Sequence, residues 1–180
     1  MGPNELSLLR VFRENILKKL DLDRVDAIKD DRAALELEIS DVLQRVSTEI
    51  GQYLSTQLRL ELIKLISDEI SGYGPLRDLM EDDTISDILV NGPEQIFVER
   101  RGLLEKTDTF FLNNQQLTEI ARRLVSKVGS RVDDSQPLVD ARLPDGSRLN
   151  VVIAPITLDG TSISIRKFGK GKKTLGDLIN

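Results

Sequence analysis

The chain has 180 residues, with 25 Lys and Arg against 30 Asp and Glu, a formal net charge of -5, and neither Cys nor His. This acidic balance excludes the broad positive field that is typical of nucleic-acid-binding proteins. The absence of Cys and His excludes a disulfide framework, the common zinc sites and His-based acid–base catalysis. Most hydrolase templates are therefore excluded, and we expect no catalytic and no metal-binding residues.

No apolar run approaches the length that is needed to span a bilayer. Residues 1–20 carry charges where a signal peptide needs an uninterrupted apolar stretch, namely Arg10, Arg13, Glu14 and Lys18. We therefore expect a cytosolic protein. Because the chain starts with Met-Gly-Pro and stops within a helix-like stretch at 174–180, we also expect it to be a piece of a longer protein.

The first 70 or so residues have Gly only at positions 2 and 51 and Pro only at position 3, which favours helices. Three apolar stripes at helical spacing comprise Leu6, Leu9, Phe12, Ile16 and Leu20; Leu35, Ile39, Val42, Val46, Ile50 and Tyr53; and Leu58, Leu62, Ile63, Ile66 and Ile70. They predict a three-helix bundle over 1–66, with a break around Asp21 to Asp31. A long helix bent at Gly51 is the alternative. The stripes could face a partner protein, but the interior of the bundle is favoured.

Gly and Pro at 72–75 predict the end of the helical part. Short segments rich in β-branched or aromatic residues then predict strands at 85–90, 95–99, 103–106, 138–143, 148–154 and 161–167. Between the third and fourth strands, Asn113 and Gln116 resemble a capping box that opens a helix ending near Gly129. The order predicts an α+β domain with a mainly antiparallel sheet over 67–168, preceded by the helical bundle.

Three arginines are the candidate binding residues. Side chains alternate along a strand, so Leu149, Val151 and Ile153 should face the core, as should Ile163 and Ile165. The arginines should then share the opposite face: a hairpin at Asp145-Gly146 brings Arg142 near Arg148, and one at Asp159-Gly160 brings Arg148 near Arg166 or Lys167. Like charges on neighbouring strands destabilise a sheet, so the row Arg142, Arg148 and Arg166 indicates an anion, and the planar guanidinium suits phosphate.

Simpler interpretations stay open. The arginines could be solvated charges that are balanced by Asp133, Asp134, Asp140 and Asp145. The basic segment 166–173 is interpreted as a linker, because no window matches the phosphate loop G-x-x-x-x-G-K-[ST]. The acidic runs at 81–83 and 133–134 are interpreted as caps or solvated turns.

Four motifs carry a family resemblance: ISGYGPL at 70–76, ISDILVNG at 85–92, VDARLPDGSRLN at 139–150 and SIRKF at 164–168. In order and spacing they resemble the N-terminal domain of CpaF-type ATPases of Flp/Tad pilus assembly, within the type II/IV secretion ATPase superfamily. The resemblance covers about residues 67–180 and implies a PAS-like fold for 67–168, with 169–180 as the linker and the start of a C-terminal ATPase domain.

The resemblance also implies a hexameric ring at the cytoplasmic face of the inner membrane, docked to a membrane platform protein. ATP and magnesium would be held in the intact protein, with Arg142, Arg148 and Arg166 near the phosphates. The fragment itself should bind nucleotide weakly and should not hydrolyse ATP. A free-standing adaptor for protein partners is the alternative. Single-stranded nucleic acid is disfavoured, because the basic tail offers Phe168 as its only aromatic residue.

Overall fold

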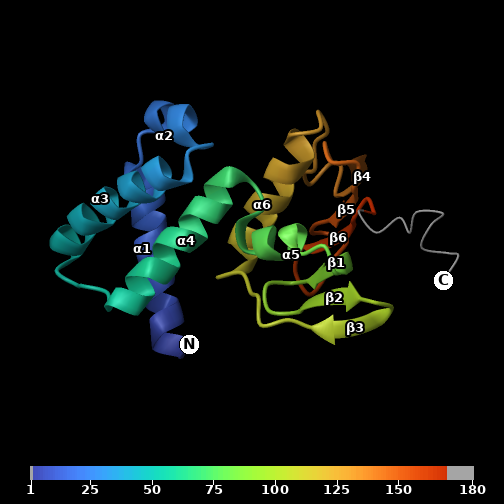
Figure 1. The fold of residues 1–180 in the computed structure, drawn as a ribbon, viewed down its shortest axis with the longest axis horizontal. Coiled ribbons are helices and arrows are strands. Elements are labelled where there is room, and N and C mark those ends of the chain that lie inside the picture. Colours follow the sequence, from blue (N-terminus) through green and yellow to red (C-terminus); the bar gives the residue numbers. More distant parts are fainter. Residues whose placement is uncertain (1, 170–180) are drawn as a thin grey trace, which may run out of the picture. The chain divides into compact units, whose positions relative to one another are not determined.

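The computed structural model describes residues 2–169, and the chain divides into two compact units, Met1–Pro75 and Leu76–Asn180 (Figure 1). The division falls later than the boundary suggested after residue 66, because the helix that contains this residue continues to Ser71. The helix predicted at 174–180 and most of the basic tail lie outside the described residues.

The first unit contains four helices within the described residues: α1 (Pro3–Lys19), α2 (Leu22–Ile28), α3 (Arg32–Ile50) and α4 (Thr56–Ser71). The predicted three-helix bundle is therefore correct in its long helices, but the expected break at 21–31 holds the additional short helix α2. The alternative prediction, one long helix bent at Gly51, is wrong. Gly51 has φ 71° and ends α3, and the side chain of Ser55 caps the start of α4.

The three stripes form the interior of this unit. Helices α1, α3 and α4 contact one another. Each contributes fully buried apolar side chains: Leu9, Phe12 and Ile16 from α1; Leu35, Ile39, Val42 and Val46 from α3; and Leu62 and Ile66 from α4. Tyr53 is the exception, since it follows the end of α3 and is 67% exposed. The stripes thus serve mainly as a core, as the pattern favoured.

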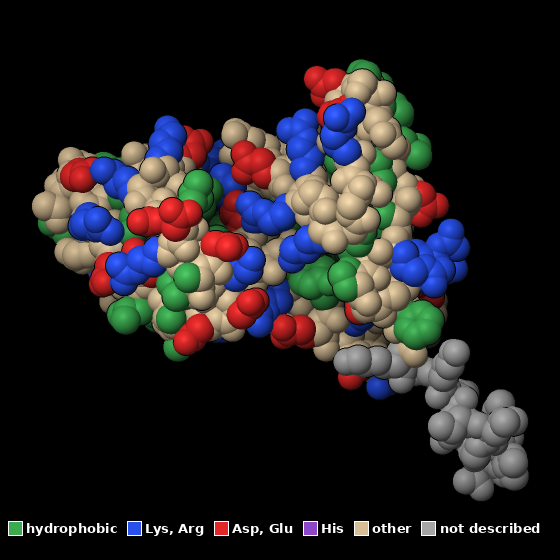
Figure 2. All heavy atoms as spheres, turned by 90° about the horizontal axis from the view of Figure 1, so that it is seen from above, with side chains coloured by type: hydrophobic (Ala, Val, Ile, Leu, Met, Phe, Trp, Pro, Cys, Tyr) green, Lys and Arg blue, Asp and Glu red, His purple; other side chains and the backbone are tan. Residues whose placement is uncertain are grey.

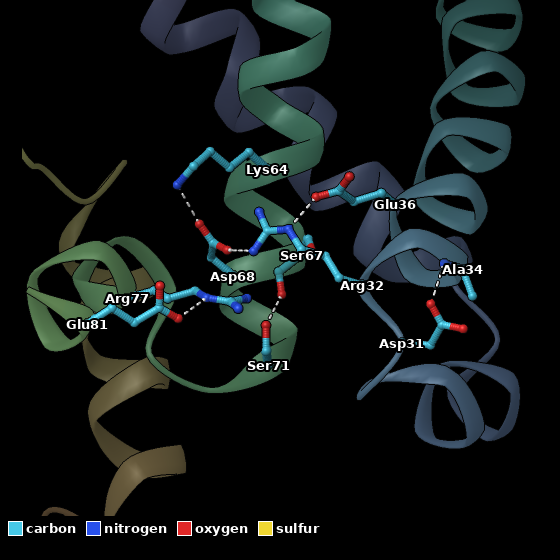
Figure 3. Close-up of polar contacts among 10 residues, drawn as sticks. All are labelled: Asp31, Arg32, Ala34, Glu36, Lys64, Ser67, Asp68, Ser71, Arg77 and Glu81. Atoms are coloured by element: carbon cyan, nitrogen blue, oxygen red, sulfur yellow. Dashed lines mark hydrogen bonds and ion pairs between the residues drawn. The ribbon is translucent and has the colours of Figure 1, made fainter.

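Charged side chains also join these helices. Arg13 on α1 forms a buried ion pair with Glu69 on α4, with Nη2 2.6 Å from Oε1. Figure 3 shows a second group, in which Asp68 accepts from Arg32 on α3 and from Lys64 on α4, each at 2.9 Å. On the outer surface acidic and basic side chains are interspersed (Figure 2), so this unit has no field of a single sign on the face shown.

The Arg13–Glu69 pair provides a first test. Removing Arg13 takes away the counter-ion that lies 2.6 Å from the buried Glu69 carboxylate, so Arg13→Met should lower the free energy of unfolding by about 3–5 kcal/mol. The double variant Arg13→Met/Glu69→Met should recover most of that loss. The matched control is Lys19→Met, which breaks the exposed pair with Glu49 and should cost about 1 kcal/mol or less. Urea unfolding followed by circular dichroism measures the differences, and equal losses from Arg13→Met and Lys19→Met would contradict the assignment.

A 3₁₀ turn (Gly74–Leu76) spans the division between the units along the chain, and α5 (Arg77–Glu81) follows it as a short helix that the sequence analysis missed. The second unit continues with β1 (Ile85–Asn91), β2 (Ile96–Arg100), β3 (Leu103–Lys106), α6 (Asn114–Ser126), β4 (Leu138–Arg142), β5 (Arg148–Val152) and β6 (Ser162–Arg166). The strands form one sheet in the order β3-β2-β1-β6-β5-β4, and all neighbours pair antiparallel. The predicted α+β class is confirmed.

Helix α6 covers one face of this sheet and packs on β5 (Figure 1). Leu149, Val151, Ile153, Ile163 and Ile165 point to the covered side and are buried, as the alternation predicted. Asn113 caps α6 by accepting from the backbone N–H of Gln116 at 2.8 Å. In a capping box the Gln116 side chain would also accept from the backbone N–H of Asn113. Here the Gln116 Oε1 accepts from the N–H of Leu112 instead, one residue earlier. The other sheet face is left half-buried or exposed along β4, β5 and β6.

At one end of the sheet the β1–β2 turn lies against the loop that enters β6. Gly92 has φ 75°, and a Cβ there would stand 2.8 Å from the carbonyl oxygen of Asp159. The N–H of Gly92 also donates to the carbonyl of Thr161 at 3.0 Å. This close approach helps to keep β1 and β6 in register.

Gly92→Ala should therefore destabilise the second unit by at least about 2 kcal/mol, because both the left-handed backbone and the collision oppose it. Gly102→Ala is the matched control, since φ is 80° but nothing lies within 4 Å of the added methyl group. Only the backbone cost of about 1 kcal/mol is expected there. Thermal unfolding compares the two variants, and a Gly92 variant that is no less stable than the Gly102 variant would refute the contact.

Candidate functional site

Strands β4, β5 and β6 place the three candidate arginines in one row across the sheet. Arg142 of β4 pairs with Arg148 of β5, and Arg148 pairs with Arg166 of β6. Both hairpin registers that the sequence predicted are therefore confirmed, and Arg166, not Lys167, is the neighbour of Arg148. Lys167 instead donates to the backbone carbonyl of Asp82 at 2.5 Å.

The same row continues into acidic residues that the sequence analysis did not place there. Asp87 of β1 lies opposite Arg166 on one side and opposite Glu99 of β2 on the other. The Arg166 Nε donates to Asp87 Oδ1 at 3.0 Å. The sequence did place Asp87 in a predicted strand, 85–90. It could not show that this strand lies beside β6, because the two strands are far apart in the sequence and no tight turn joins them.

Of the four aspartates proposed to balance the arginines, only Asp140 forms an ion pair with the row, with its Oδ2 3.8 Å from Arg148 Nη2. Asp133 pairs with Arg131 instead. Arg142 makes no ion pair with any residue of the part that the structure describes. Balance by one of the four named aspartates is thus found for Arg148 alone, and Arg166 is balanced by Asp87 instead.

A shallow depression of about 400 Å³ lies on the open sheet face. Its polar lining is Asp87, Glu99, Asp140, Arg148, Asn150, Ser164 and Arg166, whereas Arg142 does not line it. Asn150 and Ser164 pair across β5 and β6 in the row next to the arginines, so an amide and a hydroxyl lie beside two guanidinium groups. The side chains of Arg148 and Arg166 are 65% and 73% exposed. The donors are therefore accessible, and their exposed ion pairs are weak.

The hairpin between β4 and β5 is held in shape by its own residues and by the chain that leaves β6. The Asp145 carboxylate accepts from the Ser147 N–H at 2.9 Å, and Gly146 adopts φ 89°. A Cβ at Gly146 would meet the ring of Phe168 at 3.1 Å. The Phe168 N–H donates to the buried Ser147 hydroxyl at 3.2 Å. The arginine pair that flanks this hairpin is thus fixed by a well-connected turn.

The acidic runs at 81–83 and 133–134 act as turn caps, as predicted. Asp82 accepts from the hydroxyl and the N–H of Thr84 at 2.6 and 2.9 Å and forms an ion pair with Arg100 at 2.7 Å. The Thr84 hydrogen bonds, with the Arg100 pair, hold the pKa of Asp82 well below its usual range. Hydrogen bonds from Ser135 and Gln136 lower the pKa of Asp133. Neither cap contributes to the arginine row.

The lowered pKa of Asp82 has a measurable consequence. A carboxyl group with a depressed pKa in the folded state stabilises the fold above its unfolded pKa of about 4, and this contribution is lost as the pH falls toward the folded pKa. Asp82→Asn should therefore lower the melting temperature at pH 7, and the gap to the wild type should narrow below about pH 4. Asp134→Asn, an exposed control with the same charge change, should show a smaller gap. Calorimetry from pH 7 to 3 checks this, and a gap that stays constant would contradict it.

Within residues 2–169 there is no cluster of three or more Asp and Glu side chains arranged to hold a metal ion. No helix among these residues has the length and apolar character that crossing a bilayer requires. The depression combines guanidinium, amide and hydroxyl groups, which donate hydrogen bonds and suit an oxyanion, with three carboxylates, which repel one.

Comparison with known proteins identifies the relatives of this chain. The family described as "Type II/IV secretion system protein" matches residues 69–180. An uncharacterized protein of Methanocaldococcus jannaschii is 30% identical over 169 residues, which cover 91% of this chain and 23% of that protein. The type IV secretion system protein VirB11 of Brucella suis is 33% identical over 104 residues, which cover 57% of this chain and 29% of that protein.

A solved structure is similar as well. The VirB11 ATPase of the Brucella suis type IV secretion system, crystallised with sulphate, superposes with a TM-score of 0.54 at 29% identity. The match covers 61% of this chain and 34% of that one.

The α+β fold is similar to that of a part of the VirB11 ATPase. The chain belongs to the type II/IV secretion system protein family. It spans about a quarter to a third of the length of the relatives described here.

Proposed function

We propose that this chain is the N-terminal, non-catalytic portion of a secretion or pilus-assembly ATPase and that Arg142, Arg148 and Arg166 contact the phosphates of ATP at an interdomain cleft. The observation that carries the proposal is the register that places the three arginines in one row on the open sheet face. Family membership supports it independently.

The chemistry of the row fits phosphate. Neighbouring strands lie about 4.8 Å apart, so adjacent arginines can both reach one phosphoryl group or two that are linked. A guanidinium donates two parallel hydrogen bonds to an oxyanion, and its charge offsets the negative charge of the transferred group. Asn150 and Ser164 can donate further hydrogen bonds from the adjacent row. A phosphate would also relieve the repulsion between the paired arginines.

The remaining chemistry belongs to other parts of the parent protein. The chain has no G-x-x-x-x-G-K-[ST] motif, so the loop that cradles the phosphates and the magnesium ligands must come from a C-terminal domain. Magnesium would bridge and neutralise the outer phosphates there. The present chain would position the nucleotide from the opposite side, and closure of the two domains would link hydrolysis to movement.

The finer assignment follows the resemblance of the four motifs. We assign the parent protein to the CpaF type of Flp/Tad pilus assembly, as a hexamer that lies at the cytoplasmic face of the inner membrane and docks to a platform protein. Residues 1–66 form the extension that would contact a partner, residues 67–168 the nucleotide-facing domain, and residues 169–180 the linker to the motor.

An adaptor without a nucleotide role is the second candidate. The ion pairs of Arg166 with Asp87 and of Arg148 with Asp140 favour it, because they show that two of the three arginines already have counter-ions. In that case the row would be ordinary surface, and the sheet unit would bind proteins only.

Arg148→Ala in the full-length parent protein separates the two functions. If Arg148 stabilises the phosphates, ATPase activity should fall at least about a hundredfold with folding preserved, because positioned charge contributes this much to transition-state stabilisation. Arg122→Ala on α6, which removes an exposed arginine from another part of the same unit, is the matched control and should retain full activity. Steady-state ATP hydrolysis and circular dichroism provide the readouts. Full activity of the Arg148 variant would support the adaptor.

A further inference from the structure

The arginine row is electrically balanced by the residues around it. Three arginines share the open sheet face with three carboxylates: Asp87 and Glu99, which continue the same row, and Asp140 in the adjacent row. An incoming phosphate would therefore meet two guanidinium groups that already have partners, those of Arg148 and Arg166. Anion binding requires those ion pairs to rearrange.

Asp87 is the strongest of these counter-ions. It lies directly opposite Arg166, with 3.0 Å between Nε and Oδ1, and its side chain is only 18% exposed while that of Arg166 is 73% exposed. Asp87 also faces Glu99 on its other side, a like-charge pair that disfavours the sheet. The positive charge of Arg166 therefore also offsets the repulsion between Asp87 and Glu99.

Asp140 is a looser counter-ion. It pairs with Asn150 across the strands and reaches Arg148 diagonally, at 3.8 Å between Oδ2 and Nη2. Both side chains are at least 60% exposed, so the pair is easily screened. Arg142 has no counter-ion within the described residues. The three arginines therefore differ in how readily they can bind an added anion. Arg142 should bind it most readily, Arg148 less so and Arg166 least.

We propose that Asp87 and Asp140 are displaceable counter-ions, which hold Arg166 and Arg148 until a phosphate replaces them and thereby limit the affinity of the row for phosphate. This inference rests on the proposed phosphate role of the arginines. A phosphate contact with Arg148 or Arg166 must exchange an existing ion pair for a new one, so the net gain from these two residues is small for the chain alone. The carboxylates also keep the row from binding polyanions indiscriminately.

The test measures binding of inorganic tripolyphosphate to the 180-residue chain by calorimetry at low salt. Asp87→Asn removes the charge but keeps the shape, so the dissociation constant should fall about two- to fivefold, the range expected for an exposed ion pair. Asp140→Asn should tighten binding by about twofold or less. Arg166→Ala should weaken it. Glu81→Gln is the matched control, because it removes one negative charge from a pair on α5 outside the row.

A spectroscopic readout tests displacement directly. In ¹⁵N-labelled protein the Nε–Hε resonance of Arg166 should move when tripolyphosphate is added and should already differ in the Asp87 variant, whereas Glu81→Gln should leave it unchanged. Circular dichroism verifies that each variant is folded, and the exposed Asp140 variant provides a second route should Asp87→Asn not fold.

Each outcome has a defined meaning. The phosphate role stands if Arg166→Ala weakens tripolyphosphate binding. If Asp87→Asn and Asp140→Asn then leave binding unchanged or weaken it, the counter-ion role is overturned. Binding that none of the arginine or aspartate variants alters overturns both. If the wild type binds too weakly to measure, the double variant Asp87→Asn/Asp140→Asn must bind measurably, and its failure to do so would refute the proposal.

Discussion

The antiparallel register of β4, β5, β6 and β1 is the constraint on which the candidate site depends. The buried face of these strands is filled by Leu149, Val151, Ile163 and Ile165. Side chains alternate along a strand, so a slip by one residue would expose this apolar set and bury the arginines. The hydrophobic core thus specifies the charged row on the other face, and the arginines are aligned without any need to interact favourably with one another.

A row of like charges is a cost that the fold tolerates for physical reasons. The guanidinium groups lie on the open face, where water screens their repulsion, and two of them have neighbouring carboxylates. Packing alone would be satisfied equally well by neutral polar residues at Arg142, Arg148 and Arg166. Packing therefore does not account for arginine at these three positions, whereas the proposed phosphate role would.

Local patterns predicted most of the sheet unit, because its hairpins and strand alternation depend on neighbours in the sequence. The pairing of Arg142 with Arg148 followed from the Asp145-Gly146 turn in this way. The partnership of Asp87 with Arg166 could not be predicted, because β1 and β6 are separated by more than 70 residues and no turn joins them. The helices α2 and α5 were missed because elements of seven and five residues carry little periodicity.

The end of β6 links the candidate site to the chain that follows it. Arg166 is the last residue of the strand and faces the open side, whereas Lys167 donates to carbonyl oxygens at the end of α5. The next residue, Phe168, packs on Gly146 and donates to Ser147 within the β4–β5 turn. Three consecutive residues thus contribute an arginine to the row, an anchor to α5 and a contact to the turn between Arg142 and Arg148. A change in the direction of the chain after Phe168 would act on the hairpin that positions Arg142 and Arg148. In the proposed motor this would provide a short physical connection between the linker and the arginine row.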